Sequence, residues 1–462
     1  MTVPDHIFKG YDIRGIYPED LNEESIAVIV AAIYKFFKKG KPEDEALTLV
    51  VGTDMRVSSP SLTKVAIDTL VSLGAHVIDV GIVSTPTFYF AVSHYGYECG
   101  MQITASHNPP QWNGIKFLMK GSQGLVKIGK STGMDEIKGM VASGDVATPQ
   151  PGGSVEEKKG ILDDEVENAL SILGNPKVNK FKIVADPANA MGSQYIAALF
   201  EQIPQDLVKM NWELDGTFPA HEPDPFKPEN LVDLQRRVLE EKADLGLAPD
   251  GDGDRLFFVD NNGIAVPPTI ITSIVAKELL RKNPGETIYV DIRYLLTPQK
   301  IIAELGGKME ITKVGHAYIT EAMNTTKGVF AGESSAHYYF RATGSVESQM
   351  PIIIAVLSAM TEEGKTLSEL VEEYRRSYES GEFNFKVTNA KEILKKVKEA
   401  YKEGVFEGMD GIAISFPTWR FSMRTSNTEP LLRLNVEAYE KLEMEEKRDE
   451  LMKFITDNAV MA

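Results

Sequence analysis

The stretch Leu47-Thr-Leu-Val-Val-Gly52, together with Ser61–Leu73 and Ala75-His-Val-Ile-Asp-Val80 after it, decides the class of fold. The first and last pieces are short, apolar and rich in β-branched residues, whereas the middle piece repeats its apolar residues with helical spacing. Two strands separated by a helix of this length are typical of a parallel sheet with helices packed on its faces. The stretch therefore predicts an α/β fold.

The same alternation of strands and helices extends through most of the chain. A linker rich in Gly, Pro, Ser and Thr is expected at Ser143–Gly153, and the alternation restarts after it. Near the C-terminus the strand-like runs come closer together, which indicates an α+β unit. We predict three similar α/β domains with parallel or mixed sheets and a smaller C-terminal α+β domain. Their expected bounds are 1–150, 151–256, 257–368 and 369–462.

The individual elements follow from the same patterns. Strands are expected at Gly100–Thr104, Lys182–Asp186, Asp244–Ala248, Thr287–Asp291, Gly328–Ala331, Asn384–Val387, Gly411–Ser415 and Leu431–Glu437. Helices are expected at Thr87–Tyr95, Ser193–Ile203, Leu231–Lys242, Thr269–Arg281, Leu295–Leu305, His316–Asn324, Thr366–Tyr378 and Lys391–Tyr401, followed by a charged closing helix.

Composition excludes several classes of protein. The chain has 462 residues, of which 43% are hydrophobic and 25% charged, the ordinary balance of a soluble globular protein. This balance excludes a disordered chain, a collagen-like chain and a disulfide scaffold. The net charge of −18 opposes a broad interface with nucleic acid or with an anionic membrane, so neither is expected as a partner. A local positive pocket for a small anion remains compatible with this charge.

The number of cysteines and the length of the apolar runs indicate where in the cell the protein is expected. Cys99 is the only cysteine in the sequence, so an internal disulfide is excluded and no Cys/His cluster has metal-site spacing. This fits a reducing cytosol, and we expect a cytoplasmic protein. Met1–Gly15 lacks an apolar signal core. The longest apolar run, Ile352–Met360, is far shorter than the roughly 20 residues of a membrane span.

A first candidate site is the loop Thr104-Ala-Ser-His-Asn-Pro-Pro110, which follows an expected strand. Open α/β sheets place their ligands at such strand ends. Ser106 stands among small and turn-forming residues, so we expect its hydroxyl to be exposed, with His107 and Lys116 nearby. A hydroxyl beside positive charge suits phosphoryl chemistry, because the charge that develops on phosphate oxygens needs cations. Taken alone, the loop also fits an ordinary Asn-Pro turn.

A second candidate is Asp250-Gly-Asp-Gly-Asp254, followed by Arg255. Carboxylates at alternate positions can converge on one hard cation, and the glycines relieve crowding. An EF-hand loop is excluded, because its sixth and twelfth positions would be Arg255 and Asn261 instead of Gly and Glu. Three carboxylates this close repel one another without a cation. The loop predicts a metal site, with Mg²⁺ completing its shell with water and phosphate, although a solvated acidic turn is the alternative.

Two further loops are weaker candidates by themselves. In Gly332-Glu-Ser-Ser-Ala-His337, the Glu and Ser side chains can hydrogen-bond vicinal hydroxyls, and His337 can move a proton or contact a phosphate. Arg424-Thr-Ser-Asn-Thr-Glu-Pro430 combines an arginine with hydroxyl and amide side chains and with backbone N–H groups, as a phosphate cradle requires. Each also fits a plainer structure, a polar turn at a strand end for the first and a hairpin loop for the second.

One competing motif is Gly124-Leu-Val-Lys-Ile-Gly-Lys-Ser131, which fits the pattern of a nucleotide-binding P-loop and follows a strand candidate, Ile115–Met119. The residues Leu125 to Ile128 are bulky and β-prone, whereas backbone amides must close tightly around a phosphate. The next segment contains three glycines, so the supporting helix is poor. These glycines are Gly133, Gly139 and Gly144.

Together with Tyr11-Asp-Ile-Arg-Gly15, the four candidate loops occur in the order found in the α-D-phosphohexomutases. The whole chain resembles the bacterial phosphomannomutase/phosphoglucomutase branch of that family. The resemblance implies four domains around a central cleft, each lending a loop. It also implies an enzyme, an intramolecular phosphotransferase that interconverts hexose 1-phosphate and hexose 6-phosphate, of mannose or glucose or both. The implied route passes through a phosphoserine and a hexose 1,6-bisphosphate, which is also the activator, with Mg²⁺ as cofactor.

The resemblance also assigns roles to residues. The implied catalytic residues are Ser106, Lys116, Arg14 and His337. The implied Mg²⁺ ligands are the phosphorylated Ser106, Asp250, Asp252 and Asp254. The implied substrate-binding residues are Tyr11, Arg255, Gly315, His316, Glu333, Ser335, Arg424, Ser426, Asn427 and Thr428.

Two departures from the family pattern leave alternatives open. Ala336 stands where the family usually has Gly, and Glu347-Ser-Gln349 stands where related proteins usually carry an Asp and a Gly. The preferred hexose therefore stays open, and a phosphoglucosamine mutase is an alternative within the family. Outside it, the alternatives are a P-loop nucleotide hydrolase using Lys130 and Ser131, and a non-catalytic sugar-phosphate-binding protein. A small phosphosugar is the expected partner, bound by a monomer or a weak homo-oligomer.

Overall fold

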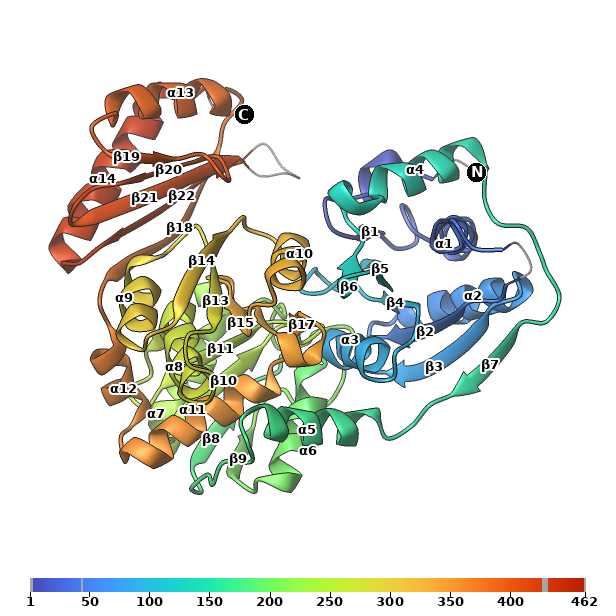
Figure 1. The fold of residues 1–462 in the computed structure, drawn as a ribbon, viewed down its shortest axis with the longest axis horizontal. Coiled ribbons are helices and arrows are strands. Elements are labelled where there is room, and N and C mark those ends of the chain that lie inside the picture. The colour runs from blue at the N-terminus through green and yellow to red at the C-terminus, as the bar shows by residue number, and fades with distance from the viewer. Residues whose placement is uncertain (1–2, 43–44, 426–430, 461–462) are drawn as a thin grey trace.

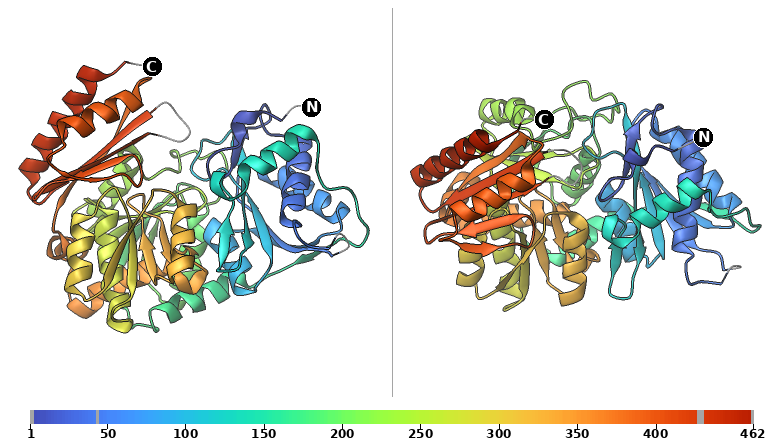
Figure 2. Two further views of the ribbon diagram at one scale, coloured as in Figure 1. Left: turned by 45° about the horizontal axis from the view of Figure 1, so that its top comes forward. Right: turned by 90° about the horizontal axis from the view of Figure 1, so that it is seen from above.

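The structure is a computed structural model that describes residues 3–42, 45–425 and 431–460. Within these residues the strands form four sheets, one in each of four domains that we number along the chain. The fourth domain packs beside the third and lies across from the first, while the second and third domains form the central body (Figures 1 and 2). The prediction of three α/β domains followed by a smaller α+β domain is confirmed.

The first domain contains a mixed sheet with the strand order β1-β5-β4-β2-β3-β7, to which β6 adds beside β5. The unit predicted from residues 47–80 is present as β2, α2 and β3, with β2 and β3 parallel. The expected linker leads into one more strand of this sheet, β7, which pairs parallel with β3 before the chain leaves the domain. The elements are β1 Ile13–Ile16, α1 Glu23–Phe37, β2 Thr48–Thr53, α2 Ser59–Ser72, β3 His76–Ile82, α3 Thr85–His94, β4 Cys99–Ile103, β5 Trp112–Lys120, β6 Leu125–Lys127, α4 Met134–Ser143 and β7 Ser154–Glu157.

The second and third domains share one continuous hydrophobic core, which joins them into a single body. Their sheets have the orders β12-β11-β10-β8-β9 and β14-β13-β15-β16-β17. The second domain comprises α5 Ile161–Ile172, β8 Lys182–Ala185, α6 Gly192–Gln202, β9 Asp206–Lys209, α7 Val232–Glu241, β10 Leu245–Pro249, β11 Leu256–Asp260 and β12 Ala265–Val266. The third comprises α8 Pro268–Lys282, β13 Thr287–Asp291, α9 Leu296–Glu304, β14 Lys308–Thr312, α10 His316–Thr326, β15 Phe330–Gly332, β16 Tyr338–Phe340, β17 Val346–Glu347, α11 Met350–Glu363 and α12 Leu367–Tyr374.

The fourth domain has an antiparallel sheet of order β18-β22-β21-β20-β19 and its own core. Its strands and helices are β18 Tyr378–Lys386, α13 Ala390–Ala400, β19 Val405–Glu407, β20 Ile412–Ser415, β21 Trp419–Thr425, β22 Leu431–Ala438 and α14 Lys441–Asn458. Arg420 anchors this domain to the third. Its guanidinium donates to the carbonyls of Ile292 and Arg293 at 2.9 and 3.0 Å and pairs with Glu437 at 2.9 Å.

Each candidate loop connects two neighbouring antiparallel strands. The serine loop joins β4 to β5, and the acidic loop joins β10 to β11. The third loop joins β15 to β16, and the fourth lies between β21 and β22. A short connection between paired strands holds its two ends in register, so the first three domains each present their loop from a rigid edge.

The P-loop alternative does not fit the local structure. Residues 125–127 form β6, which pairs antiparallel with β5, and a 3₁₀ helix at Lys130–Thr132 follows. A P-loop requires a phosphate-cradling turn that opens directly into an α-helix. Lys130 and Ser131 are instead exposed on the surface. Separately, none of the helices in the described ranges has the length and apolar character needed to cross a membrane.

Candidate active site

Residues of the first three loops, together with Arg424 from the start of the fourth, line one cavity of about 480 Å³. Asp250 and Asp252 are fully buried beside it. Ser426, Asn427 and Thr428 lie outside the described residues. The other sequence-predicted site residues line the cavity and are Tyr11, Arg14, Ser106, Lys116, Asp254, Arg255, Gly315, His316, Glu333, Ser335, His337 and Arg424.

Ser106 has a φ of 53°, in the left-handed region that a serine adopts only when its surroundings hold it there. Its backbone N–H donates to Thr104 Oγ1 at 3.0 Å. Its Oγ lies 3.1 Å from His107 Nδ1 and 3.5 Å from Asp250 Oδ2. Ser106 is only 2% exposed, so the expectation of an exposed hydroxyl is wrong. The loop folds inward onto the acidic loop, and the hydroxyl faces the cavity instead of bulk water.

The acidic loop presents three buried carboxylates, those of Asp250, Asp252 and Asp254, whose oxygens lie within 4.8 Å of one another. Gly251 is required here, because a Cβ at this position would lie 2.4 Å from the carbonyl oxygen of Ser106. Burial and the other two carboxylates hold the pKa of Asp250 well above its ordinary value. Asp252 Oδ1 is buried and has no hydrogen-bond partner among the described residues. An oxygen cluster with this electrostatic strain is suited to hold a cation.

Lys116 supplies the fixed positive charge next to this cluster. Its Nζ lies 2.6 Å from Asp252 Oδ2 and 2.5 Å from Asp254 Oδ2. Burial opposes its charge, but the two carboxylates hold the pKa of Lys116 well above its ordinary value. The neighbouring imidazole of His107 behaves differently, because burial and then Arg255 and Arg14 hold its pKa well below the ordinary value. The cations near Ser106 are therefore a lysine and arginines, and His107 is neutral.

The third loop is organised around Glu333. Its Oε1 accepts from the backbone N–H of Gly315 at 3.1 Å, and its Oε2 accepts from the hydroxyl of Tyr339 at 2.8 Å. Ser335 Oγ lies 3.0 Å from His337 Nδ1. Ala336 has a φ of 65°, so it adopts the left-handed conformation that the family's usual glycine would adopt more easily.

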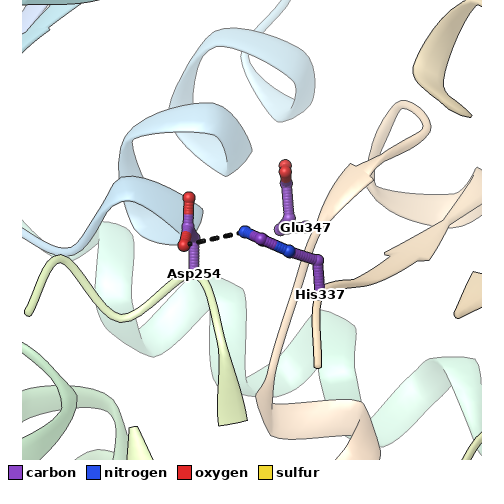
Figure 3. Close-up of side chains that lie close together, drawn as sticks. All are labelled: Asp254, His337 and Glu347. Carbon is purple, nitrogen blue, oxygen red and sulfur yellow. Dashed lines mark ion pairs between the residues drawn. The ribbon is translucent and has the colours of Figure 1, made fainter. Parts of the chain in front are cut away.

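His337 stands between the third loop and the acidic loop, with its Nε2 3.3 Å from Asp254 Oδ1 (Figure 3). Although burial opposes its charge, Asp254 and Glu333 raise the pKa of His337 to about 9. Glu347, the other departure, follows in the adjacent strand β17 and pairs with Lys127 of β6 in a fully buried ion pair. Lys127 Nζ also lies 4.6 Å from the ring of Tyr89. The pair links the first and third domains beside the cavity.

The fourth domain contributes an arginine wall. Arg424 is 7% exposed, and its Nη2 lies 3.3 Å from Glu382 Oε2. Arg433 and Arg293 approach the same carboxylate, at 3.4 and 3.9 Å, and all three arginines line the cavity. Arg293 is also bound to Asp291 and donates to Ser335 Oγ at 3.2 Å. Guanidinium groups that line a cavity can give a phosphate charge-assisted hydrogen bonds.

The N-terminal motif closes the cavity from the first domain. Arg14 Nε donates to Asp12 at 2.7 Å, and its Nη1 donates to the side chain of Asn108 at 2.6 Å. The hydroxyl of Tyr11 donates to the carbonyl of Val314 at 3.2 Å, and its ring lies 5.2 Å from that of His316. Burial first, then nearby acidic groups, raise the pKa of Tyr11 to about 12. These contacts tie the first domain to the loop before α10 in the third.

Sequence reasoning missed several residues that organise the site. Arg56 binds the serine loop from below, and Arg293 and Arg433 extend the arginine wall around Glu382. Each of these residues lies outside the motif loops, so its type and spacing carry no local signal. Their roles become clear only in the folded protein, where segments distant in the sequence meet.

Comparison with known proteins identifies the family. Four family models match the chain in order: the alpha/beta/alpha domains I, II and III of phosphoglucomutase/phosphomannomutase at residues 5–144, 164–263 and 267–378, and its C-terminal domain at residues 382–454. The chain belongs to the phosphoglucomutase/phosphomannomutase family.

Relatives align with the chain over nearly its whole length. It is 36% identical over 459 residues to a phosphomannomutase of Vibrio cholerae, covering 97% of this chain and 98% of that protein. It is 37% identical over 455 residues to a phosphomannomutase of Methanocaldococcus jannaschii, covering 97% of each. A crystal structure of a phosphoglucomutase/phosphomannomutase family protein from Burkholderia thailandensis superposes with a TM-score of 0.87 at 28% identity, covering 99% of each chain.

Proposed function

We propose that the protein is a mutase that interconverts hexose 1-phosphates and hexose 6-phosphates. The observation that carries the proposal is a single cavity with two unlike walls. Ser106 and the acidic cluster form one wall, and the arginines around Glu382 form the other. A phosphosugar mutase must hold one phosphate while it transfers another, and this cavity offers a separate place for each. The names of the relatives support the same reaction.

In the proposed reaction Ser106 carries the phosphoryl group. The bond between its Oγ and phosphorus breaks as a sugar hydroxyl forms a new bond to the same phosphorus. The sugar hydroxyl gives its proton to a base, the released serine oxygen takes up a proton, and the second transfer reverses these proton movements. The resulting hexose 1,6-bisphosphate turns around in the cavity. Its other phosphate is then transferred to Ser106, which restores the phosphoserine and leaves the isomeric monophosphate. A hexose 1,6-bisphosphate would also serve as activator, because it phosphorylates a serine that has lost its phosphate.

The acidic cluster fits a divalent metal ion. Three buried carboxylates and an unpartnered oxygen, Asp252 Oδ1, form a hard oxygen site, and Mg²⁺ is the ion that we propose for it. Asp250, Asp252 and Asp254 would hold the ion together with the phosphate on Ser106. When bound, the ion neutralises charge on the phosphoryl oxygens during transfer.

The remaining residues of this wall position and stabilise the transferring group. We propose that Lys116 and Arg14 stabilise charge on the phosphoryl oxygens, because both are fixed by carboxylates and line the cavity. We propose that His337, which Asp254 and Glu333 keep protonated up to about pH 9, contacts the transferring phosphoryl group and donates a proton to the oxygen that it leaves. Arg255 lies beside the His337 imidazole, with its Nε 3.3 Å from His337 Nε2.

The opposite wall would bind the phosphate that is not transferred. Arg424, with Arg433 and Arg293 beside it, supplies charge-assisted hydrogen bonds. The same cradle would serve both half-reactions, since the bisphosphate presents its two phosphates in turn. By the family resemblance, Ser426, Asn427 and Thr428 belong to this cradle.

We propose that glucose and mannose phosphates are both substrates. Glu333 and Ser335 would bind the hydroxyls at C3 and C4, which these two sugars share, so the loop hardly separates them. Galactose differs at C4 and would leave a buried partner unpaired, a loss of about 1–3 kcal/mol. A phosphoglucosamine mutase is the alternative, because Glu347 departs from the family pattern close to this loop.

A coupled assay with glucose 1-phosphate and mannose 1-phosphate, Mg²⁺ and trace hexose 1,6-bisphosphate tests the proposal. Turnover of both sugars and a phosphorylated fraction in intact-mass spectra are expected. The Ser106→Ala variant should fold but lose both properties. Tight binding of phosphosugar without turnover would identify a binding protein, and a strong preference for glucosamine phosphate would identify the alternative mutase. Damage by Lys130→Ala, with Ser106→Ala fully active, would overturn the mechanism in favour of a P-loop enzyme.

A further inference from the structure

Arg56 lies behind the serine loop, in the segment that follows β2, and its side chain is completely buried. Its two terminal nitrogens donate to four backbone carbonyls. Nη2 donates to the carbonyls of Ser106 and Asn108 at 2.8 and 2.6 Å. Nη1 donates to those of Pro109 and Trp112 at 2.8 and 3.0 Å. All four hydrogens on these nitrogens are therefore directed at one loop.

The residue with the strained backbone is the one that Arg56 binds. A left-handed serine persists only where its surroundings determine its conformation. The carbonyl of Ser106 is held by the guanidinium, and the backbone of Gly251 packs so closely against it that no Cβ fits. This carbonyl therefore lies between Arg56 and the acidic loop. The Oγ of the same residue lies 3.5 Å from Asp250 Oδ2.

The guanidinium is itself fixed from two further directions. Asp54, which is 1% exposed, lies 3.2 Å from Arg56 Nε and accepts from the backbone N–H of Arg56 at 3.0 Å. The ring of Phe218, from the second domain, lies 5.1 Å from the Arg56 guanidinium carbon. Gly216 is required beside it, because a Cβ there would lie 2.6 Å from the Cα of Arg56. Arg56 therefore connects the serine loop to the domain that carries the acidic loop.

We propose that Arg56 is a positioning residue for the reaction, which holds Ser106 in the conformation that directs its Oγ at the acidic cluster. The four hydrogen bonds that it donates to the loop go to backbone carbonyls, and it does not line the cavity, so it affects the transfer step through Ser106. A misplacement of about 1 Å at a reacting atom can cost on the order of 100-fold in rate. The inference rests on the proposed mutase function.

The test compares Arg56→Lys with Phe218→Leu. Lysine keeps the charge but cannot bind four carbonyls in the fork geometry of a guanidinium. Leucine loosens the packing on the guanidinium and leaves its hydrogen bonds to the loop intact. For both variants and the wild type, kcat and KM are measured with a hexose 1-phosphate, Mg²⁺ and trace bisphosphate. The thermal midpoint and the fraction of Ser106 phosphorylated by glucose 1,6-bisphosphate are measured in parallel.

For Arg56→Lys we expect a fall in kcat of about 100-fold with KM changed less than about threefold. Phe218→Leu should keep kcat within about threefold of the wild type, even if its thermal midpoint falls as much as that of Arg56→Lys. In Arg56→Ala, millimolar guanidinium should restore part of the lost kcat by occupying the vacated space. A kcat of Arg56→Lys near that of the wild type overturns the proposal. Failure of Arg56→Lys to fold, or an equal loss of kcat in Phe218→Leu, overturns it as well. An inactive wild type would contradict the mutase function instead.

Discussion

Glu165 provides a test of the structure that does not depend on the reaction. Its carboxyl is buried in α5 of the second domain, is 2% exposed, and accepts from Thr87 Oγ1 of the first domain at 2.6 Å. Burial raises its pKa from 4.5 to about 7, although the bond from Thr87 acts in the opposite direction. The folded state therefore holds this proton up to about pH 7, whereas the unfolded chain releases it near pH 4.5.

The direction in which stability changes with pH follows from this difference between the folded and unfolded pKa of Glu165. Between about pH 4.5 and pH 7 the folded state binds more protons, so the contribution of Glu165 to stability falls as the pH rises and levels off above pH 7. At 1.36 kcal/mol per pKa unit, the loss between about pH 5.5 and pH 8.5 amounts to roughly 2 kcal/mol. For a body the size of the joined second and third domains, this corresponds to about 4–8 °C in the thermal midpoint.

The assay is differential scanning calorimetry of the wild type and Glu165→Gln at about pH 5.5 and pH 8.5. Glutamine resembles the neutral acid, so the variant should gain about 4–8 °C relative to the wild type as the pH rises between these values. Glu167→Gln, on the exposed side of the same helix, is the matched control and should show a constant difference. A difference for Glu165→Gln that is the same at both pH values would refute the reasoning, because Glu165 would then be ionised in the folded protein.

Three further changes have expected outcomes. Asp252→Asn should weaken Mg²⁺ binding at least about 10-fold, measured by calorimetric titration, with little change in thermal midpoint; unchanged affinity would mean that the cluster is not the metal site. Arg424→Ala should raise KM for both 1-phosphate and 6-phosphate substrates by roughly 10–100-fold and release more bisphosphate per turnover, and unaltered values in both directions would exclude the phosphate cradle. Lys127→Met should lower the free energy of unfolding, measured with denaturant, by about 3–5 kcal/mol, because it leaves Glu347 buried and unpaired. Adding Glu347→Leu should recover most of this loss, and no recovery would show that the two residues are not coupled.

The elements with strong periodicity were predictable because their causes are local. β13 begins and ends at Thr287 and Asp291 as expected, and β2, α2 and β3 lie within two residues of their predicted bounds. β7 was missed, because its four residues, Ser154–Glu157, are all exposed and three of them are polar, so the segment shows no alternation of buried and exposed positions. Only its pairing with β3 makes it a strand.

The sequence by itself determined the fold class, the four candidate loops and the residue types that the chemistry needs, since turn formation and apolar periodicity act over a few neighbouring residues. The tertiary structure decided how those loops meet. It turned Ser106 inward instead of outward, placed Lys116 between two aspartates 136 and 138 residues away, and brought Arg56 under the serine loop. These arrangements depend on contacts between residues far apart in the chain. The packing of whole domains, and not any local preference, brings such residues together.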